Sequence, residues 1–137
     1  MAARSKILVV DDDDAILGSL GGLLESEGYE VEIAHNGREA LDKLARTDPP
    51  ALILLDLKMP VMDGWQFLSE RSQDRASSGV PIVLLSGLPF IPDAPGVADF
   101  LSKPIHPPRL LACVRRFCGD PSRDGRDVPA GRPTTRT

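Results

Sequence analysis

Cysteine is scarce in this sequence, which has two cysteines among its 137 residues. Cys113 and Cys118 lie five positions apart in one stretch with helical spacing, so they point to different faces of a helix and are poorly placed for a mutual disulfide. Two thiols and a distant histidine are also too few ligands for a zinc site. We therefore expect both cysteines to be reduced, as is usual in a cytosolic protein.

Long apolar runs are missing as well. The apolar run before the first aspartates is too short for a signal peptide, and no stretch approaches the roughly 20 apolar residues needed to cross a bilayer. Apolar residues make up 42% of the chain and charged residues 26%, which is the composition of a soluble globular domain. These absences predict a cytoplasmic protein that does not contact the membrane.

An excess of basic charge is also absent, because the net charge is -4. The bulk charge therefore does not indicate nucleic-acid binding. The two histidines, His35 and His106, are isolated in the sequence, and we interpret them as ordinary surface residues rather than phosphodonors. The acidic residues are unevenly spread: four consecutive aspartates, residues 11–14, directly follow an apolar run. That placement indicates a site.

Short apolar runs alternate with stretches of helical periodicity along the chain. Asp13 or Asp14 is placed to cap the first helix, and Asn36 with Glu39 resembles a capping box at the second. This alternation predicts a parallel sheet covered by helices on both faces, with right-handed connections. The expected strands are residues 7–10, 31–34, 51–55, 80–85 and 99–102, and the expected helices begin near residues 14, 37, 64 and 107.

Polar side chains end four of the five expected strands. In open parallel sheets the working site lies beyond the carboxyl ends of the strands, so these side chains should meet at one edge. A single aspartate at a strand end is usually an ordinary loop residue, and it is the convergence of several groups that indicates function. The converging residues are Asp11, Asp12, Asp56, Ser86 and Lys103.

The converging residues suit phosphoryl transfer to a carboxylate. Clustered carboxylates repel one another unless a cation or a proton joins them, and Asp11, Asp12 and Asp56 would favour a hard divalent ion such as Mg²⁺. A carboxylate beside such an ion can attack an activated phosphoryl group to form an acyl phosphate. Lys103 could supply a cation and Ser86 a hydroxyl for the charge that develops on the phosphoryl oxygens.

Four motifs resemble those of the receiver domains of two-component response regulators, and the resemblance covers residues 5 to about 118. They are ILVVDDD at 7–13, LDLKMPVMDG at 55–64, PIVLLSG at 81–87 and Lys103-Pro104. Their order and their positions at strand ends make the combination specific. The resemblance implies an α/β fold: a doubly wound, flavodoxin-like sheet of five parallel strands in the order 2-1-3-4-5.

The resemblance also implies a role for each site residue. Asp56 would be the phosphoacceptor. Asp12 and Asp56 would bind Mg²⁺ by their side chains, while Asp11 would act mainly through water and Lys58 would offer its backbone carbonyl.

Three further residues follow from the same resemblance. Ser86 would donate a hydrogen bond to the phosphoryl oxygen in the active state, and Lys103 would form an ion pair with it. Phe100 matches the aromatic switch position of the family. The Lys103-Pro104 bond is expected to be cis.

The function implied is a phosphoaspartate switch that receives its phosphoryl group from a sensor histidine kinase or a phosphotransfer protein and alters binding to a downstream protein. It would not be an enzyme beyond Mg²⁺-dependent self-phosphorylation and slow autodephosphorylation, and no direct DNA binding is expected. One alternative is a module that binds its partner without phosphorylation. Another is a Mg²⁺-dependent phosphatase, for which a chain this short has no cap to build a substrate pocket.

The sequence departs from the family between Ser86 and Lys103. These residues are 17 positions apart, roughly a helical turn and a half less than is usual for the family. Pro89, Pro92 and Pro95 fall in this interval, and prolines at that spacing break a helix. We expect the fourth helix of the family to be shortened or absent, with residues 88–97 forming a loop or at most one turn.

The C-terminal segment differs in composition from the rest of the chain. From Gly119 onward the residues are mainly glycine, proline, arginine, aspartate, serine and threonine, with four arginines and three aspartates. Such a segment buries too little apolar surface to order itself. We therefore expect a single receiver domain over residues 1–118 and a flexible tail over residues 119–137.

Overall fold

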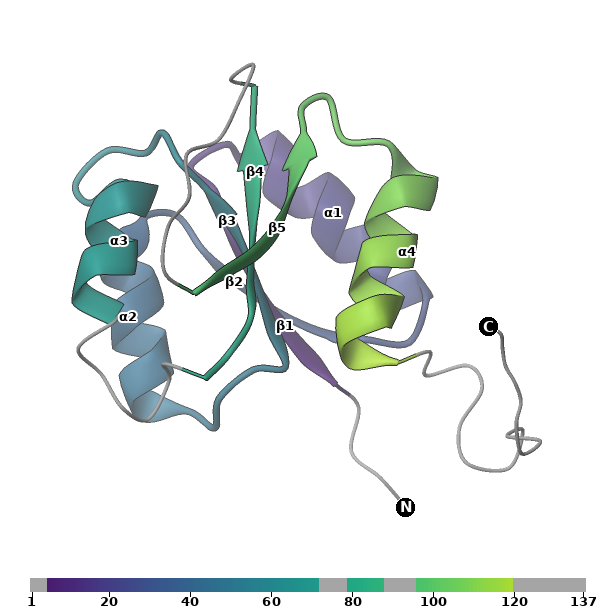
Figure 1. The fold of residues 1–137 in the computed structure, drawn as a ribbon, viewed down its shortest axis with the longest axis horizontal. Coiled ribbons are helices and arrows are strands. Elements are labelled where there is room, and N and C mark those ends of the chain that lie inside the picture. Colours follow the sequence, from purple (N-terminus) through teal and green to yellow (C-terminus); the bar gives the residue numbers. More distant parts are fainter. Residues whose placement is uncertain (1–4, 72–78, 88–95, 120–137) are drawn as a thin grey trace.

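The computed structural model describes residues 5–71, 79–87 and 96–119, and within them it contains a five-stranded sheet and four helices (Figure 1). The strands are parallel and lie in the order β2-β1-β3-β4-β5, as expected. In chain order the elements are β1 (Lys6–Val10), α1 (Asp14–Ser26), β2 (Glu30–Ala34), α2 (Gly37–Arg46), β3 (Leu52–Asp56), α3 (Gly64–Arg71), β4 (Ile82–Ser86), β5 (Val97–Ser102) and α4 (Pro107–Cys118).

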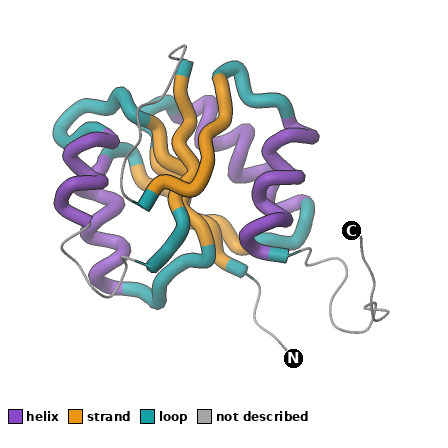
Figure 2. Tube along the Cα trace, viewed as in Figure 1, coloured by secondary structure: helices purple, strands orange, loops and turns teal. Residues whose placement is uncertain are grey.

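Helices cover both faces of the sheet, so the molecule has three layers (Figures 1 and 2). Because successive strand residues point to opposite faces, Ile7 and Val9 enter the core beneath α1 and α4, whereas Leu8 and Val10 enter the core beneath α2 and α3. All five residues of β3 and all five of β4 are buried. Apolar burial on both faces is the main stabilising term for a sheet of this kind.

Side-chain caps determine where three of the helices begin. The Asp13 carboxylate accepts hydrogen bonds from the amides of Ala15 and Ile16 at the start of α1. The Asn36 side chain caps α2 by accepting from the Glu39 amide at 2.8 Å. The expected capping box at α2 is only half formed, because the Glu39 carboxylate accepts from the amide of His35 rather than from that of Asn36.

A reciprocal capping box is found at α3 instead. The Asp63 carboxylate accepts from the Gln66 amide at 2.9 Å, and the Gln66 side chain accepts from the Asp63 amide at 3.1 Å. This arrangement satisfies two amides that would otherwise lack partners at the first turn. It also fixes the point at which the loop after β3 enters α3.

Strand β5 is longer than the sequence predicted, because it begins at Val97 rather than at Asp99. The register with β4 shifts between Ile82 and Val83, which pair with Val97 and Asp99, so Ala98 is an extra residue in β5. Alternation is interrupted at such a bulge, and a strict period-2 pattern therefore misses the first two residues. Most of the interval expected to be a loop, residues 88–97, lies outside the described residues.

Two expectations from composition can be compared with the described part of the chain. No helix there is long and apolar enough to cross a membrane. Cys113 and Cys118 are both free cysteines, as predicted.

Helix α1 carries glycines that can be tested directly. An added Cβ at Gly18 or at Gly22 would have no atom within 4 Å, and glycine inside a helix costs about 1 kcal/mol relative to alanine. We expect Gly18→Ala and Gly22→Ala each to raise the free energy of unfolding by about 0.5–1 kcal/mol, measured by urea denaturation. A loss of stability in either variant would mean that the helix surface at that position is not open.

Candidate functional site

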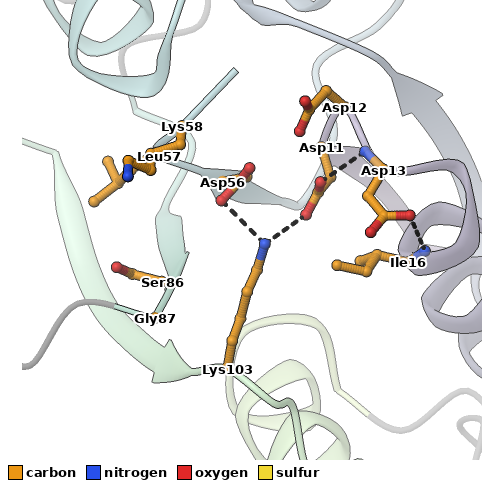
Figure 3. Close-up of a pocket in the computed structure, with 10 residues that line it drawn as sticks. All are labelled: Asp11, Asp12, Asp13, Ile16, Asp56, Leu57, Lys58, Ser86, Gly87 and Lys103. Carbon is orange, nitrogen blue, oxygen red and sulfur yellow. Dashed lines mark hydrogen bonds and ion pairs between the residues drawn. The ribbon is translucent and has the colours of Figure 1, made fainter.

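The predicted site residues come together at the carboxyl edge of the sheet. Asp11 directly follows β1, Asp56 and Ser86 are the last residues of β3 and β4, and Lys103 directly follows β5. With Asp12 and Lys58 they line one open depression of about 450 Å³, which Figure 3 shows. The parallel register makes this convergence necessary, because every strand ends at the same edge.

Lys103 is the centre of the polar contacts. Its Nζ donates to Asp11 Oδ2 at 3.0 Å and to Asp56 Oδ1 at 3.1 Å (Figure 3). Its backbone amide donates to the Ser86 carbonyl at 2.8 Å, which joins the end of β5 to the end of β4. The Lys103-Pro104 peptide bond is cis, as predicted.

Burial and charge both act on the acceptor carboxylate. Asp11 is 1% exposed and Asp56 is 6% exposed. Burial raises the pKa of Asp56, and the neighbouring Asp11 raises it further, while Lys103 opposes the shift. For Lys103, burial alone would lower the pKa, but its contacts with Asp11 and Asp56 outweigh burial and raise it. The Lys103 ammonium group therefore compensates part of the negative charge of two buried carboxylates.

The carboxylates fit a divalent cation. Asp11, Asp12 and Asp56 each offer an oxygen, and these three oxygens lie within 4.8 Å of one another. A set made only of oxygen donors suits Mg²⁺, which keeps several waters and accepts few protein ligands. A cation there would also offset the repulsion that raises the pKa of Asp56. Lys58 lines the same depression, beside the acceptor, where its carbonyl was predicted to serve as a ligand.

The loop after Asp56 is held by backbone contacts at both of its ends. The Gly64 amide donates to the Leu57 carbonyl at 3.0 Å, and the Gly37 amide donates to the Met62 carbonyl at 2.8 Å. Between these anchors the Met62 amide donates to the Pro60 carbonyl at 2.7 Å, forming a tight turn centred on Val61. Val61 has a positive φ of 67°, which is rare for a β-branched residue.

The two predicted switch residues occupy different environments. Ser86 is buried and lines the depression. Phe100 lies in β5, is 37% exposed, and is not among the residues that line the depression. The structure therefore brings Ser86 to the acceptor and leaves Phe100 at the surface of the edge strand.

Sequence reasoning missed some residues at this edge. Ile16, Leu57 and Gly87 also line the depression. Each of them lies next to, or one helical turn from, a residue that the sequence did indicate, but none carries a polar side chain that would have marked it. Asp13 also lines the depression, and its side chain caps α1, as its position before the helix suggested.

His35 is a surface residue, as predicted, but the prediction that it is isolated is wrong. Its ring lies between two carboxylates, with Nδ1 at 2.8 Å from Glu39 Oε1 and Nε2 at 3.2 Å from Asp14 Oδ1. Glu39 is one helical turn from His35, which the sequence could have revealed. The approach of Asp14 depends on the pairing of β1 with β2, which a linear pattern does not display.

The buried acceptor should make stability depend on pH. Because the pKa of Asp56 is raised in the folded state, its ionised form opposes folding at neutral pH. This cost begins to fall as the pH drops through the folded pKa and is gone below the ordinary pKa of the unfolded chain. We expect Asp56→Asn to be more stable than wild type at pH 7 in Mg²⁺-free buffer, with the difference shrinking in acid. Urea unfolding across this pH range measures it.

The exposed Asp48→Asn is the matched control for this pH series, because it removes one carboxylate far from the depression. An Asp56→Asn protein that is less stable than wild type at pH 7 would contradict the argument. That result would mean that the Asp56 carboxylate gains more from Lys103 than it loses on burial.

Comparison with known proteins places nearly all of the described fold in one family. The family model described as "Response regulator receiver domain" matches residues 7–115. The response regulator Rre1 of Synechocystis is 36% identical over 123 residues, which are 85% of this chain and 53% of that protein. The response regulator PleD of Caulobacter vibrioides is 42% identical over 120 residues, which are 84% of this chain and 26% of that protein. The chain thus spans about half or less of the length of these curated relatives.

Solved structures give the same answer. The chemotaxis protein CheY4 of Vibrio cholerae is 34% identical, with a TM-score of 0.77, and the match covers 84% of this chain and 99% of that one. The receiver domain of the sensor histidine kinase PA1611 of Pseudomonas aeruginosa is 28% identical, with a TM-score of 0.78. That match covers 86% of this chain and 100% of the other, and the PA1611 structure has a magnesium ion coordinated in its active site cleft.

Proposed function

This chain belongs to the response regulator receiver domain family, and from that premise we propose that it is a phosphoaspartate switch in which Asp56 accepts a phosphoryl group from a histidine kinase or a phosphotransfer protein. The observation that carries the proposal is the contact of one ammonium group, Lys103 Nζ, with two buried carboxylates, Asp11 and Asp56, at 3.0 and 3.1 Å. This geometry holds an acceptor oxygen and a cation side by side.

In the transfer step, an Asp56 carboxylate oxygen attacks the phosphorus of the donor. A bond from Asp56 oxygen to phosphorus forms while the bond from phosphorus to the donor nitrogen or oxygen breaks, and the leaving group departs with the electron pair. The product is an acyl phosphate on Asp56. Asp12 and Asp56 would hold Mg²⁺ by their side chains, with Asp11 acting mainly through water, and the ion would neutralise charge on the phosphoryl oxygens.

The chain's own side chains stabilise the product. Lys103 already contacts Asp56, so a small rotation of its ammonium group meets a phosphoryl oxygen. The Ser86 hydroxyl, at the end of the adjacent strand, donates to another. Phosphorylation adds negative charge at this edge, and movement of Ser86 toward it would be transmitted through β4 to β5 and Phe100. A downstream protein would recognise the altered surface.

The shape of the site also indicates which reactions it favours. Asp56 and its surroundings lie in an open depression rather than in a closed substrate pocket, which favours self-phosphorylation and slow hydrolysis of the acyl phosphate over turnover of a free substrate. Mg²⁺ is the cofactor in this proposal. No DNA contact is part of it.

The direct test is intact-protein mass spectrometry after incubation with acetyl phosphate and Mg²⁺. We expect one added phosphoryl group in the wild-type protein, none without Mg²⁺, and none in Asp56→Asn, because the acceptor oxygen is lost. A receiver domain of known activity, labelled in parallel, checks the reagent. Failure of the wild-type chain to gain a phosphoryl group while it binds Mg²⁺ would favour a module that binds its partner without phosphorylation.

A further inference from the structure

The metal-binding edge is built from two separate loops. One is residues 11–14, where the Asp11 amide donates to the Ala34 carbonyl at 3.1 Å and the Asp13 amide donates to Asp11 Oδ1 at 2.9 Å. The other is the acceptor loop, residues 57–63, whose Met62 carbonyl accepts from the amide of Gly37 at the start of α2. Pairing of β1 with β3 and the contacts of Lys103 bring the two loops together. Contacts between the N-termini of α1 and α2 further restrict their relative position.

A single side chain connects these two helix N-termini. His35, between β2 and α2, contacts Asp14, the first residue of α1, through Nε2 at 3.2 Å, and Glu39, in the first turn of α2, through Nδ1 at 2.8 Å. Its backbone amide donates to the same Glu39 carboxylate. The ring thus spans the gap between the loop that carries Asp12 and the helix that anchors the acceptor loop.

The two contacts of the His35 ring indicate its protonation state. A neutral imidazole has one donor nitrogen and one acceptor nitrogen, and an acceptor facing a carboxylate is repelled. Both contacts are favourable only when both nitrogens carry protons, that is, in the imidazolium form. The hydrogen bond to Glu39 and the charges of Glu39 and Asp14 raise the pKa of His35, outweighing its slight burial. The charged groups facing His35 are thus Asp14 from α1 and Glu39 from α2, and the pKa of Glu39 is lowered in turn.

We propose that His35 is a positioning residue for the Mg²⁺ site, in which its imidazolium form ties Asp14 on α1 to Glu39 on α2 and so holds the aspartate loop against the acceptor loop. This inference rests on the proposed function, because the site it positions is the receiver metal site. The imidazolium and the two carboxylates it contacts carry a net charge of -1. Loss of the imidazolium charge alone would therefore favour Mg²⁺ binding, so a weaker affinity in a His35 variant has to come from geometry.

The consequence is a specific dependence on pH. With a pKa raised above its ordinary value, His35 stabilises this arrangement at low pH, and the contribution is lost as pH rises through the folded pKa. An exposed ion pair that stabilises one state typically changes the corresponding equilibrium constant by a factor of about two to five. We therefore expect Mg²⁺ affinity in His35→Gln to be about threefold weaker than in wild type near pH 6 and equal to wild type near pH 8.5.

The matched control is His106→Gln, because His106 is the only other histidine in the chain and its side chain makes no capping hydrogen bond at α4. Isothermal titration calorimetry of all three proteins with Mg²⁺ at several pH values gives the affinities. Proton NMR of His106→Gln, which has a single imidazole, gives the titration of His35 itself. Urea unfolding of the Mg²⁺-free proteins gives a third readout, in which His35→Gln should be less stable than wild type only at the lower pH values.

Two outcomes would overturn the proposal: an affinity profile of His35→Gln that superimposes on that of wild type, or a His35 ring that titrates at or below the ordinary value. None of these measurements needs phosphoryl transfer. If wild type fails to accept a phosphoryl group yet Mg²⁺ binding loses its His35-dependent part in the variant, the proposed function fails and the role of His35 stands. If labelling succeeds and the profiles superimpose, only the role of His35 fails.

Discussion

Lys103→Met should destabilise the Mg²⁺-free protein by about 3 kcal/mol and slow phosphorylation from acetyl phosphate by about 100-fold or more. The stability loss follows from burial, because Asp11 and Asp56 both lose the ammonium that contacts them at 3.0 and 3.1 Å. Removing one partner of a buried ionic group leaves uncompensated charge, which costs more than the original interaction contributed. The rate falls because the same ammonium would meet the negative charge that develops on the phosphoryl oxygens.

Adding Mg²⁺ should affect the stability of Lys103→Met differently from its phosphorylation rate. A divalent cation bound by the freed carboxylates should restore much of the lost stability by mass action. The rate should remain low, because a metal held by Asp12 and Asp56 would not replace the ammonium group as a donor to the phosphoryl oxygens. Urea unfolding with and without Mg²⁺ and time-resolved mass spectrometry of the phosphorylated protein measure the two quantities.

Lys43→Met is the control for the loss of a lysine. Lys43 donates to the carbonyl of Ile33 in β2, the outer strand on the opposite side of the sheet from β5. It should leave the phosphorylation rate unchanged and alter stability by about 1 kcal/mol at most. A Lys103→Met protein with wild-type stability in the absence of Mg²⁺ would show that the buried carboxylates are compensated by another group.

Gly64→Ala should lower the free energy of unfolding by about 2–3 kcal/mol and slow phosphorylation by about tenfold or more. An added Cβ would lie 2.7 Å from the Asp56 carbonyl oxygen and 2.9 Å from Leu57 Cα. Both atoms belong to the backbone of the acceptor segment, so the clash cannot be relieved by rotating a side chain. The acceptor itself must move, and a displacement of about 1 Å is enough to cost a large factor in rate.

Gly18→Ala is the matched control for Gly64→Ala, since it makes the same chemical change in a helix where the Cβ meets no atom within 4 Å. Chemical denaturation and the acetyl phosphate labelling rate should be measured on both. If Gly64→Ala labels at the wild-type rate, the contact between α3 and the acceptor strand does not position Asp56.

Much of the acceptor site was predictable from the linear sequence because a parallel sheet converts order along the chain into position in space. Asp56 and Ser86 end buried apolar runs, Asp11 follows one, and strand ends in such a sheet meet at one edge. Identifying the strands therefore also identified the edge. The cis bond at Lys103-Pro104 was predictable only from the resemblance to the family.

Other features escaped sequence reasoning because they depend on contacts between elements. The spacing of His35 and Glu39 is visible in the sequence, but the approach of His35 to Asp14 requires the pairing of β1 with β2. The first residues of β5 were missed because a bulge at Ala98 interrupts the alternation on which strand prediction depends. The capping box was assigned to α2 rather than α3, because Asn36–Glu39 and Asp63–Gln66 offer similar cap residues and only their backbone surroundings distinguish them.

What the sequence by itself determined is the alternation of strands and helices, the family, and the side chains that end each strand, because periodicity and local motifs act over a few residues. What only the tertiary structure decided is the pairing of charges: which carboxylates share Lys103, how deeply Asp56 is buried, and which helices His35 joins. Those properties depend on distance and on exclusion of water. Both arise only when segments far apart in the chain pack together.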